Sequence, residues 1–478
     1  MNSLSTLGHR RREDLGGFWW DGLRLAFIDQ KMTGLNHGFS RWLHGKLGPL
    51  LGWVLLMGRA DAQGTDEFER PPIEYSAANP HDAVADLVGR LAAGTAKYPA
   101  TTDRERVQWL LREFQVSEAS QILVFSQTSF QNDRIRPEHP RALYFNDDIY
   151  VGWVPGGLAE LSPIDPQLGP TFYAFDPRIA ETAKISHADR FRRDSDCLRC
   201  HGTFVRDIPS VFARSVIVDS EGRPTGTLGG RLVDFTTPFA DRWGGWYVTG
   251  LHGDARHRGN IVPADGRDVS AEERLRGANV TNLTSMVDLT GYLAPGSDIV
   301  ALLVFEHQLA VHNAITRAGH HVRRMLHYQQ GVQRGLGEKV TSEPVYDSTR
   351  RAVASTAQDL LDVLLLQEEA PLPAGGVQGN GAFRRSYEAA GPKSRQGLSL
   401  RQLDLQTQLY RYRCSPLIYS RSFAALPPPL KEAFYRRLKG ILCSLEDDAR
   451  YTYLRPAERR MIREILRETL PEYAAIDA

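Results

Sequence analysis

The spacing of hydrophobic residues predicts two helices at the start of the patterned part of the chain. Asn79-Pro80 is a typical helix cap followed by a first-turn proline, and apolar residues then recur at helical spacing. A second apolar stripe, after an acidic first turn, predicts a helix over 103–116. The stripes consist of Ala83, Leu87 and Leu91 in the first helix and Val107, Leu110, Leu111 and Phe114 in the second.

Short aromatic and β-branched runs predict strands farther along the chain. Residues 122–125 form a short apolar run, and two aromatic runs at 142–145 and 149–153 flank Asn146-Asp-Asp, which predicts a hairpin. Residues 172–175 predict a further strand. The runs 211–218 and 227–235 flank a turn that is rich in Gly and Pro, which predicts a second hairpin. Antiparallel strands are therefore expected among the early helices.

After residue 297 the helical period dominates. Residues 298–330 predict one long helix, and a Pro- and Gly-rich stretch over 370–382 separates it from later amphipathic segments. Those segments predict helices near 401–413, 428–445 and 457–470. The expected fold class is α+β, with helices and antiparallel strands over 63–297 and a mainly helical region over 298–478.

An apolar run near the N-terminus predicts export. Leu47 to Met57 has the length of a signal-peptide core, follows Arg41 and Lys46, and precedes the small-residue site Ala60-Asp-Ala62. We expect residues 1–62 to be leader and signal peptide, with Gln63 as the mature terminus. Met32 is an alternative start because a leader from Met1 would carry four acidic residues. The other interpretation of the apolar run from Leu47 to Met57 is a buried helix in a cytoplasmic protein.

Composition and charge narrow the class of protein. The 478 residues are 42% hydrophobic and 24% charged, which is typical of a soluble globular chain. The net charge of +1 does not favour nucleic acid as a partner, and none is expected. Nor is a stable membrane span expected after signal cleavage. Four cysteines are too few for a disulfide scaffold; Cys414 and Cys443 either pair or remain separate thiols.

The strongest chemical signal is Cys197-Leu-Arg-Cys200-His201. In c-type cytochromes two thiols at this spacing bond to the two vinyl groups of haem, and the adjacent histidine is the proximal iron ligand. A zinc site lacks a second pair of ligands here, and a thioredoxin-like pair lacks the βαβ pattern. Since covalent haem assembly takes place outside the cytoplasm, the export signal supports the assignment. One motif predicts one covalent haem c with its iron on His201.

The second axial position distinguishes an electron carrier from a catalyst, because an open position admits a small ligand. His307 falls on the apolar stripe of the long helix over 298–330 and is the preferred distal ligand. It is alternatively a core histidine bonded to a carbonyl or carboxylate. Met286 is the next candidate, and it is alternatively a core residue. His312 lies on a different part of the same helix.

Other residues suggest haem surroundings, although ordinary packing explains them equally well. Trp243-Gly-Gly-Trp246-Tyr247 suits a loop that covers a flat apolar group. Polar side chains that could bond to the haem propionates are His252, His257, Asn260, Arg190, Arg192, Arg193 and Arg199.

Several stretches carry a resemblance to a known group. They are ALYFNDDIYVGWV, CLRCHG, RWGGWYVTG, SDIVALLVFEHQ with HNAITRA, and SLRQLDLQTQLYRYRCSPLIYS. They resemble large, exported, single-haem bacterial proteins of the cytochrome c type, over about residues 100 to 470. The resemblance implies that the haem region and the helical region form one evolutionary unit, and it places His307 in the segment EHQ. It implies no reaction.

The preferred function is periplasmic electron transfer through one covalent haem held by Cys197, Cys200 and His201, with His307 as the second ligand. The partner is then a redox protein or a small-molecule substrate. The alternative is a haem-dependent oxidoreductase of peroxidase or oxygenase type, in which His307 or a nearby histidine acts as acid and base. A third alternative is a haem-based sensor whose ligation state acts on the helical region. No catalytic residue is assigned.

Overall fold

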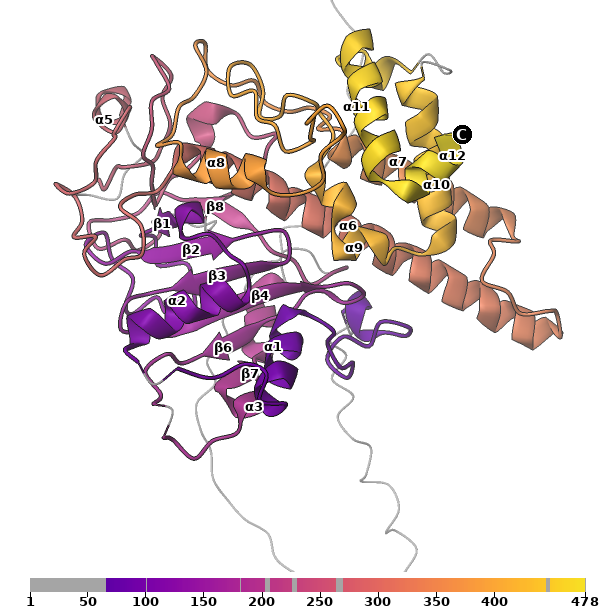
Figure 1. Cartoon of the computed structure of the whole chain (residues 1–478), viewed down its shortest axis with the longest axis horizontal. Coiled ribbons are helices and arrows are strands. Elements are labelled where there is room, and N and C mark those ends of the chain that lie inside the picture. Colours follow the sequence, from indigo (N-terminus) through magenta and orange to yellow (C-terminus); the bar gives the residue numbers. More distant parts are fainter. Residues whose placement is uncertain are drawn as a thin grey trace, which may run out of the picture. The chain divides into compact units, whose positions relative to one another are not determined.

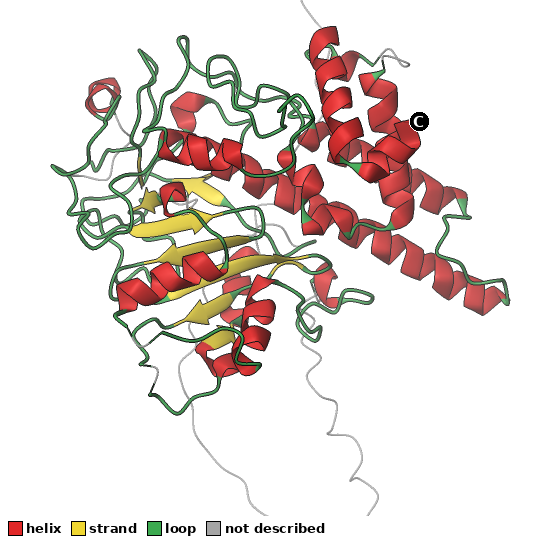
Figure 2. Ribbon diagram, in the orientation of Figure 1, coloured by secondary structure: helices red, strands yellow, loops and turns green. Residues whose placement is uncertain are grey.

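The computed structural model describes residues 66–99, 101–180, 182–202, 207–225, 230–263, 270–443 and 448–477. The expected leader and signal peptide over 1–62, with the site before Gln63, lie outside these residues. The chain from Gly64 onward forms one compact unit. The regions 63–297 and 298–478 are therefore parts of one body, and the α+β class is confirmed (Figures 1 and 2).

An antiparallel sheet of eight strands forms the centre of the first region. Its strand order is β10-β1-β2-β3-β4-β6-β7, with β5 paired to β4. The predicted hairpin is confirmed: β2 and β3 pair in register, and Asn146 Oδ1 accepts bonds from the Asp148 and Ile149 main chain in the turn. The strands are β1 (Ile122–Val124), β2 (Arg141–Phe145), β3 (Ile149–Trp153), β4 (Ala159–Asp165), β5 (Gly169–Pro170), β6 (Tyr173–Phe175), β7 (Phe191–Arg193) and β10 (Trp246–Tyr247).

A separate two-stranded sheet corresponds to the second predicted hairpin. β8 (Ala213–Ser215) pairs with β9 (Arg231–Val233) in antiparallel register. The pairing is confirmed, and both strands are shorter than predicted. Between them, Asp219 Oδ1 accepts bonds from the Glu221 and Arg223 main chain, which turns the chain near the predicted position.

Two helices pack against one face of the large sheet (Figure 1). They are α1 (Ala83–Ala92) and α2 (Asp103–Glu113), and their apolar stripes share a core with residues of β2 and β3. Both helices were predicted, but the first begins later than expected. Its cap is Asp82, whose Oδ1 accepts bonds from the Val84 and Ala85 main chain, instead of Asn79.

The long helix α6 (Ile299–Leu336) packs against the opposite face. Asp298 caps it, and its first turns share a core with sheet residues such as Phe145 and Tyr150. Its later turns belong to a second core. Among the described helices, α6 alone has the length and hydropathy to cross a membrane, and 83% of its most apolar window is buried inside the protein.

The second core is built by helices from the end of the chain. It combines the later turns of α6 with α7 (Asp347–Leu364), α10 (Pro428–Leu442) and α11 (Pro456–Thr469). The helices predicted near 428–445 and 457–470 are confirmed, whereas α7 and α8 (Ala382–Ala389) were not predicted. The remaining helices are short: α3 (His187–Arg190), α4 (Leu198–His201), α5 (Ala271–Arg276), α9 (Arg421–Ala424) and α12 (Pro471–Asp477).

The helix predicted near 401–413 is wrong. Asp404 Oδ1 accepts bonds from the main chain of Gln406 and Thr407, which forms a turn that competes with a helix. Leu405 has φ +64°, outside the right-handed helical region, and Leu403 pairs with Tyr410 across the turn. The apolar stripe of this segment packs as a loop.

Candidate functional site

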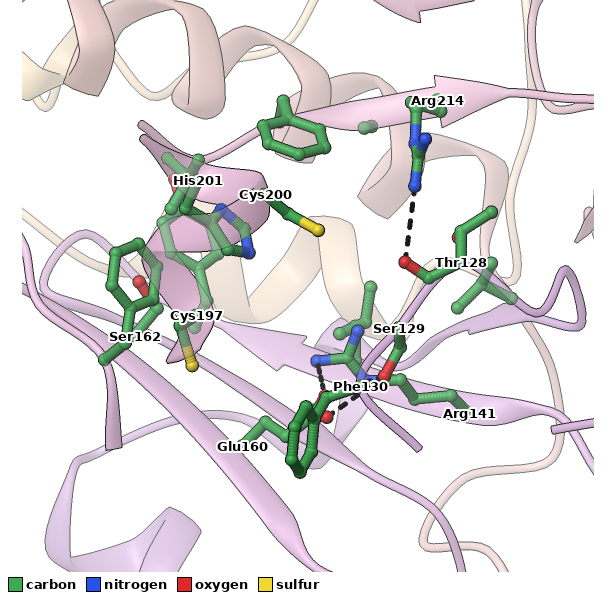
Figure 3. Close-up of a pocket in the computed structure, with 18 of the residues that line it drawn as sticks. Thr128, Ser129, Phe130, Arg141, Glu160, Ser162, Cys197, Cys200, His201 and Arg214 are labelled. Atoms are coloured by element: carbon green, nitrogen blue, oxygen red, sulfur yellow. Dashed lines mark hydrogen bonds and ion pairs between the residues drawn. The ribbon is translucent and has the colours of Figure 1, made fainter. Parts of the chain in front are cut away.

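A cavity of about 480 Å³ lies over the α6 face of the large sheet. Residues of β1, β2, β3, β4, β6 and β10 contribute to it, together with α4, β8 and α6 (Figure 3). Its apolar lining includes Val124, Phe130, Leu143, Tyr150, Leu161, Phe172, Val211, Phe212, Ala213, Pro224, Trp246, Phe305 and Leu309. Its polar lining includes Gln127, Thr128, Ser129, Asn132, Arg141, Glu160, Ser162 and Arg214. Its volume and mixed lining are typical of a site for a cofactor or small molecule.

Cys197, Cys200 and His201 all line this cavity. Asp194 accepts a bond from the Asp196 main chain and starts the short helical turn that carries the three residues. Figure 3 shows both thiols and the imidazole on this turn, facing the open space. Burial raises the pKa of the Cys197 thiol to about 12, so this cysteine is a neutral thiol at pH 7.

The His201 ring is held in one orientation. Its Nδ1 lies 2.7 Å from the main-chain carbonyl oxygen of Ser210, and it stacks on Phe172 with ring centroids 4.5 Å apart. Burial lowers the pKa of His201 to about 4. The neutral ring must donate from Nδ1 to the carbonyl, which leaves a lone pair on Nε2. A metal-binding histidine is typically oriented by such a bond.

These residues fit a covalently attached haem. Two thiols at the required spacing, a neutral imidazole with a free lone pair, and a largely apolar wall share one cavity. Within the described ranges, no group of three or more His, Cys, Asp or Glu side chains is placed to hold a bare metal ion. This donor set suits a covalently attached haem with one protein ligand on this side.

A charged pair on the sheet was missed by the sequence analysis. Arg141 of β2 and Glu160 of β4 form an ion pair, and both side chains line the cavity. Ser129 Oγ donates to the Glu160 carboxylate at 3.0 Å. Arg141 and Glu160 share a face of the sheet with Leu143, but β4 was not predicted from the sequence, so strand alternation carried no signal for this pair.

Three further polar contacts belong to the cavity wall. The Tyr150 hydroxyl lies 2.8 Å from Nδ1 of the buried His312. Trp246 Nε1 donates to the main-chain oxygen of Arg214 at 2.7 Å, and the Arg214 guanidinium donates to the Thr128 carbonyl at 3.3 Å. Of the three aromatic residues in the Trp243–Tyr247 segment, Trp246 is the one that lines the cavity.

His307, the predicted second ligand, lies outside the cavity. It is fully buried, its Nε2 lies 2.9 Å from Ser415 Oγ, and its ring contacts Phe235 and Tyr410. Phe305 and Leu309 on the same helix do line the cavity, so His307 points to another face of α6. The structure does not bring His307 together with His201, and burial lowers the pKa of His307 to about 3.

Met286, the alternative ligand, also lies elsewhere. It packs against the core that α1 and α2 form on the other face of the sheet. Among the described residues that line the cavity, His201 is the one histidine and there is no methionine. The three residues of the predicted attachment motif thus line one cavity, whereas neither predicted second ligand is among the described residues that line it.

The arginines proposed for propionates have other partners. Arg192 pairs with Asp194, and Arg199 pairs with Asp196. Arg190 lies over the Tyr98 ring, and Arg193 donates to the main-chain oxygens of Tyr75 and Ala78. Arg141 and Arg214 are the arginines that line the cavity.

The two histidines and the asparagine suggested for the same role are also engaged elsewhere. His252 and His257 pack against each other with ring centroids 4.8 Å apart. His252 Nε2 accepts from the Asn279 main chain, and His257 Nδ1 accepts from the Gly259 main chain. Asn260 bonds to the main chain of Val248. These three residues stabilise loops.

Cys414 is a free thiol in the second core, so it is not joined to Cys443 in this structure.

Comparison of the chain with protein-family models, with curated proteins and with solved structures finds no match. The cavity geometry is therefore the basis for a functional proposal.

Proposed function

We propose that this protein is an exported c-type haem protein in which Cys197 and Cys200 bind one haem covalently and His201 ligates its iron. The observation that carries the proposal is the bond from His201 Nδ1 to the Ser210 carbonyl, which presents Nε2 to the cavity that both thiols line. Haem iron supplies one-electron redox chemistry and, where a coordination position is open, binds small ligands. The localisation rests on the leader pattern of the sequence.

The lining of the cavity favours a haem-dependent oxidoreductase over a simple carrier. No second histidine and no methionine is present among the described lining residues, so neither usual ligand of a carrier is available there. The cavity instead holds the Arg141–Glu160 pair, a base and a cation at a site that admits a small molecule. The catalytic alternative therefore becomes the preferred one, without His307.

Electron transfer with a redox protein is the second candidate. Cys200 is exposed, and Phe130, which also lines the cavity, is 61% exposed. A haem attached to Cys200 would therefore have an edge close to solvent, where a partner could exchange electrons with it. The two candidates are compatible, because an oxidoreductase also needs a source of electrons.

The test of covalent attachment is production of the full chain in a host that assembles c-type haem. Haem should stay on the polypeptide after denaturing electrophoresis, and the double variant Cys197→Ala/Cys200→Ala should lose it. Cys443→Ala is the matched control, because it removes a cysteine far along the chain and should retain the haem. Covalent haem in the double variant at the level of the wild type would overturn the proposal.

Optical spectra then separate the two candidates. An oxidoreductase should show a reduced spectrum that shifts on addition of carbon monoxide, because one coordination position is open. A six-coordinate carrier should show a low-spin spectrum that carbon monoxide does not change.

A further inference from the structure

We propose that Glu160, positioned by Arg141, is the proton acceptor for a weak acid that enters the cavity. The inference rests on the proposed haem function and deepens it, since it assigns the acid–base role that the sequence analysis gave to a histidine. A weak acid must lose a proton to bind a metal as an anion. A positioned carboxylate can accept that proton.

The placement of Glu160 and Arg141 in the cavity wall supports the role of Glu160 as proton acceptor. Glu160 belongs to β4, Arg141 to β2, and both side chains keep 18–19% of their surface exposed while they line the cavity. Figure 3 shows the pair on the sheet side of the space that His201 faces.

The second support is the glycine that lies between the two strands. Gly152 of β3 is opposite Glu160 in the β3–β4 register, and a Cβ atom at Gly152 would collide with the Arg141 guanidinium. The absence of a side chain there allows Arg141 to lie flat across β3 and to reach Glu160. An ion pair that spans three strands is therefore built into the sheet.

The third support is the hydrogen bonding of the carboxylate. Ser129 Oγ lies 3.0 and 3.1 Å from the two Glu160 oxygens, and Arg141 contacts Oε2. These donors hold the carboxylate in place, as a second layer of residues does in many acid–base sites. The Arg141 charge is also placed to stabilise an anion that forms beside it.

The proposed step is a proton transfer. The weak acid HX enters the cavity, its O–H or C–H bond breaks, and the proton passes to a Glu160 oxygen. The products are X⁻, which remains beside Arg141, and the neutral carboxylic acid of Glu160. No electron leaves or enters in this step.

Cyanide is the probe, because HCN must lose a proton when it binds haem iron whereas carbon monoxide has no proton to lose. In Glu160→Gln holoprotein we expect cyanide association to be slower by about 100-fold, the lower end of the effect of a positioned base. Carbon monoxide association should change less than about threefold in the same variant. Glu113→Gln is the matched control, because Glu113 of α2 pairs with Arg90 of α1 on the other face of the sheet.

Gly152→Ala is a second variant that changes neither charged residue. The added methyl group displaces the guanidinium, so cyanide association should slow by about tenfold. Equal cyanide rates in wild type and in both cavity variants would overturn the inference while leaving the haem proposal intact. A wild-type protein without covalent haem would instead overturn the proposed function. Altered rates for both cyanide and carbon monoxide would show that the pair shapes the cavity and is not a base.

Discussion

The surroundings of His201 and His307 differ in a way that separates a candidate ligand from a core residue. Burial lowers the pKa of both imidazoles well below the usual range, to about 4 for His201 and about 3 for His307. His201 bonds to a main-chain carbonyl with Nδ1 and faces a cavity with the other edge of its ring. His307 bonds to the Ser415 side chain and is enclosed by Phe235 and Tyr410.

The comparison shows that a lowered pKa does not identify a ligand. Both rings are neutral at pH 7, and both sit among apolar groups. Only His201 combines a fixed Nδ1 donor with space for a second group at Nε2. The Ser415 hydroxyl is a partner for His307 Nε2, whereas His307 Nδ1 is buried without a hydrogen-bond partner among the described residues.

The largest expected effect is spectroscopic. If the comparison is correct, His201→Gly should retain covalent haem through the two thioether bonds and lose the wild-type absorption spectrum, because the iron loses its imidazole. Added imidazole should restore that spectrum. His307→Ala should show the wild-type spectrum with and without carbon monoxide. A spectral change in His307→Ala together with none in His201→Gly would reverse the assignment.

The second prediction concerns stability. His307→Ala removes a fully buried ring and leaves a space in the core beside Tyr410. The cost should be about 2–4 kcal/mol of unfolding free energy, the range for large buried residues replaced by alanine. Urea unfolding followed by tryptophan fluorescence measures it. His327→Ala, at an exposed position on the same helix, should change the stability by less than about 0.5 kcal/mol.

The third prediction concerns pH. His307 has a folded-state pKa of about 3, below the unfolded value of about 6.5, so the unfolded state binds its proton first as the pH falls. The stabilising contribution of this group is complete above pH 6.5 and is lost between pH 6.5 and pH 3. At pH 5 the loss is about 2 kcal/mol, at 1.36 kcal/mol per pH unit.

His307→Gln should remove this part of the pH dependence. Unfolding free energies at pH 7.5 and pH 5 should differ by about 2 kcal/mol less in the variant than in the wild type. Equal differences in the two proteins would mean that His307 is protonated in the folded state near its ordinary pKa.

Local patterns predicted much of the fold because they depend on neighbouring residues. The turn Asn146-Asp-Asp fixes the β2–β3 hairpin, and the apolar stripe of α2 fixes that helix. The segment 401–413 failed because a single Asp404 turn outweighed its helical stripe. β4 was missed because Pro163 interrupts its pattern, although the strand pairs with β3 over five residues.

The candidate site was predictable only where it is contiguous in the chain. Cys197, Cys200 and His201 form one local motif, whereas Arg141 and Glu160 meet through the register of three strands. His307 was selected because an imidazole on an apolar helical stripe needs a partner. The sequence could not show that Ser415, more than a hundred residues away, is that partner.

The smallest expected effect concerns the serines beside the two imidazoles, Ser415 next to His307 and Ser210 next to His201. Ser415→Ala removes the hydroxyl beside His307 Nε2 and leaves a buried ring nitrogen without that partner, at a cost of about 1–2 kcal/mol. Ser210→Ala removes only the bond from Ser210 Oγ to the His201 carbonyl, about 1 kcal/mol. The main-chain carbonyl that accepts from His201 Nδ1 stays in place. Both variants should therefore keep the wild-type haem spectrum. A shifted spectrum in Ser210→Ala would show that the Ser210 side chain, and not its main chain, orients the proposed iron ligand.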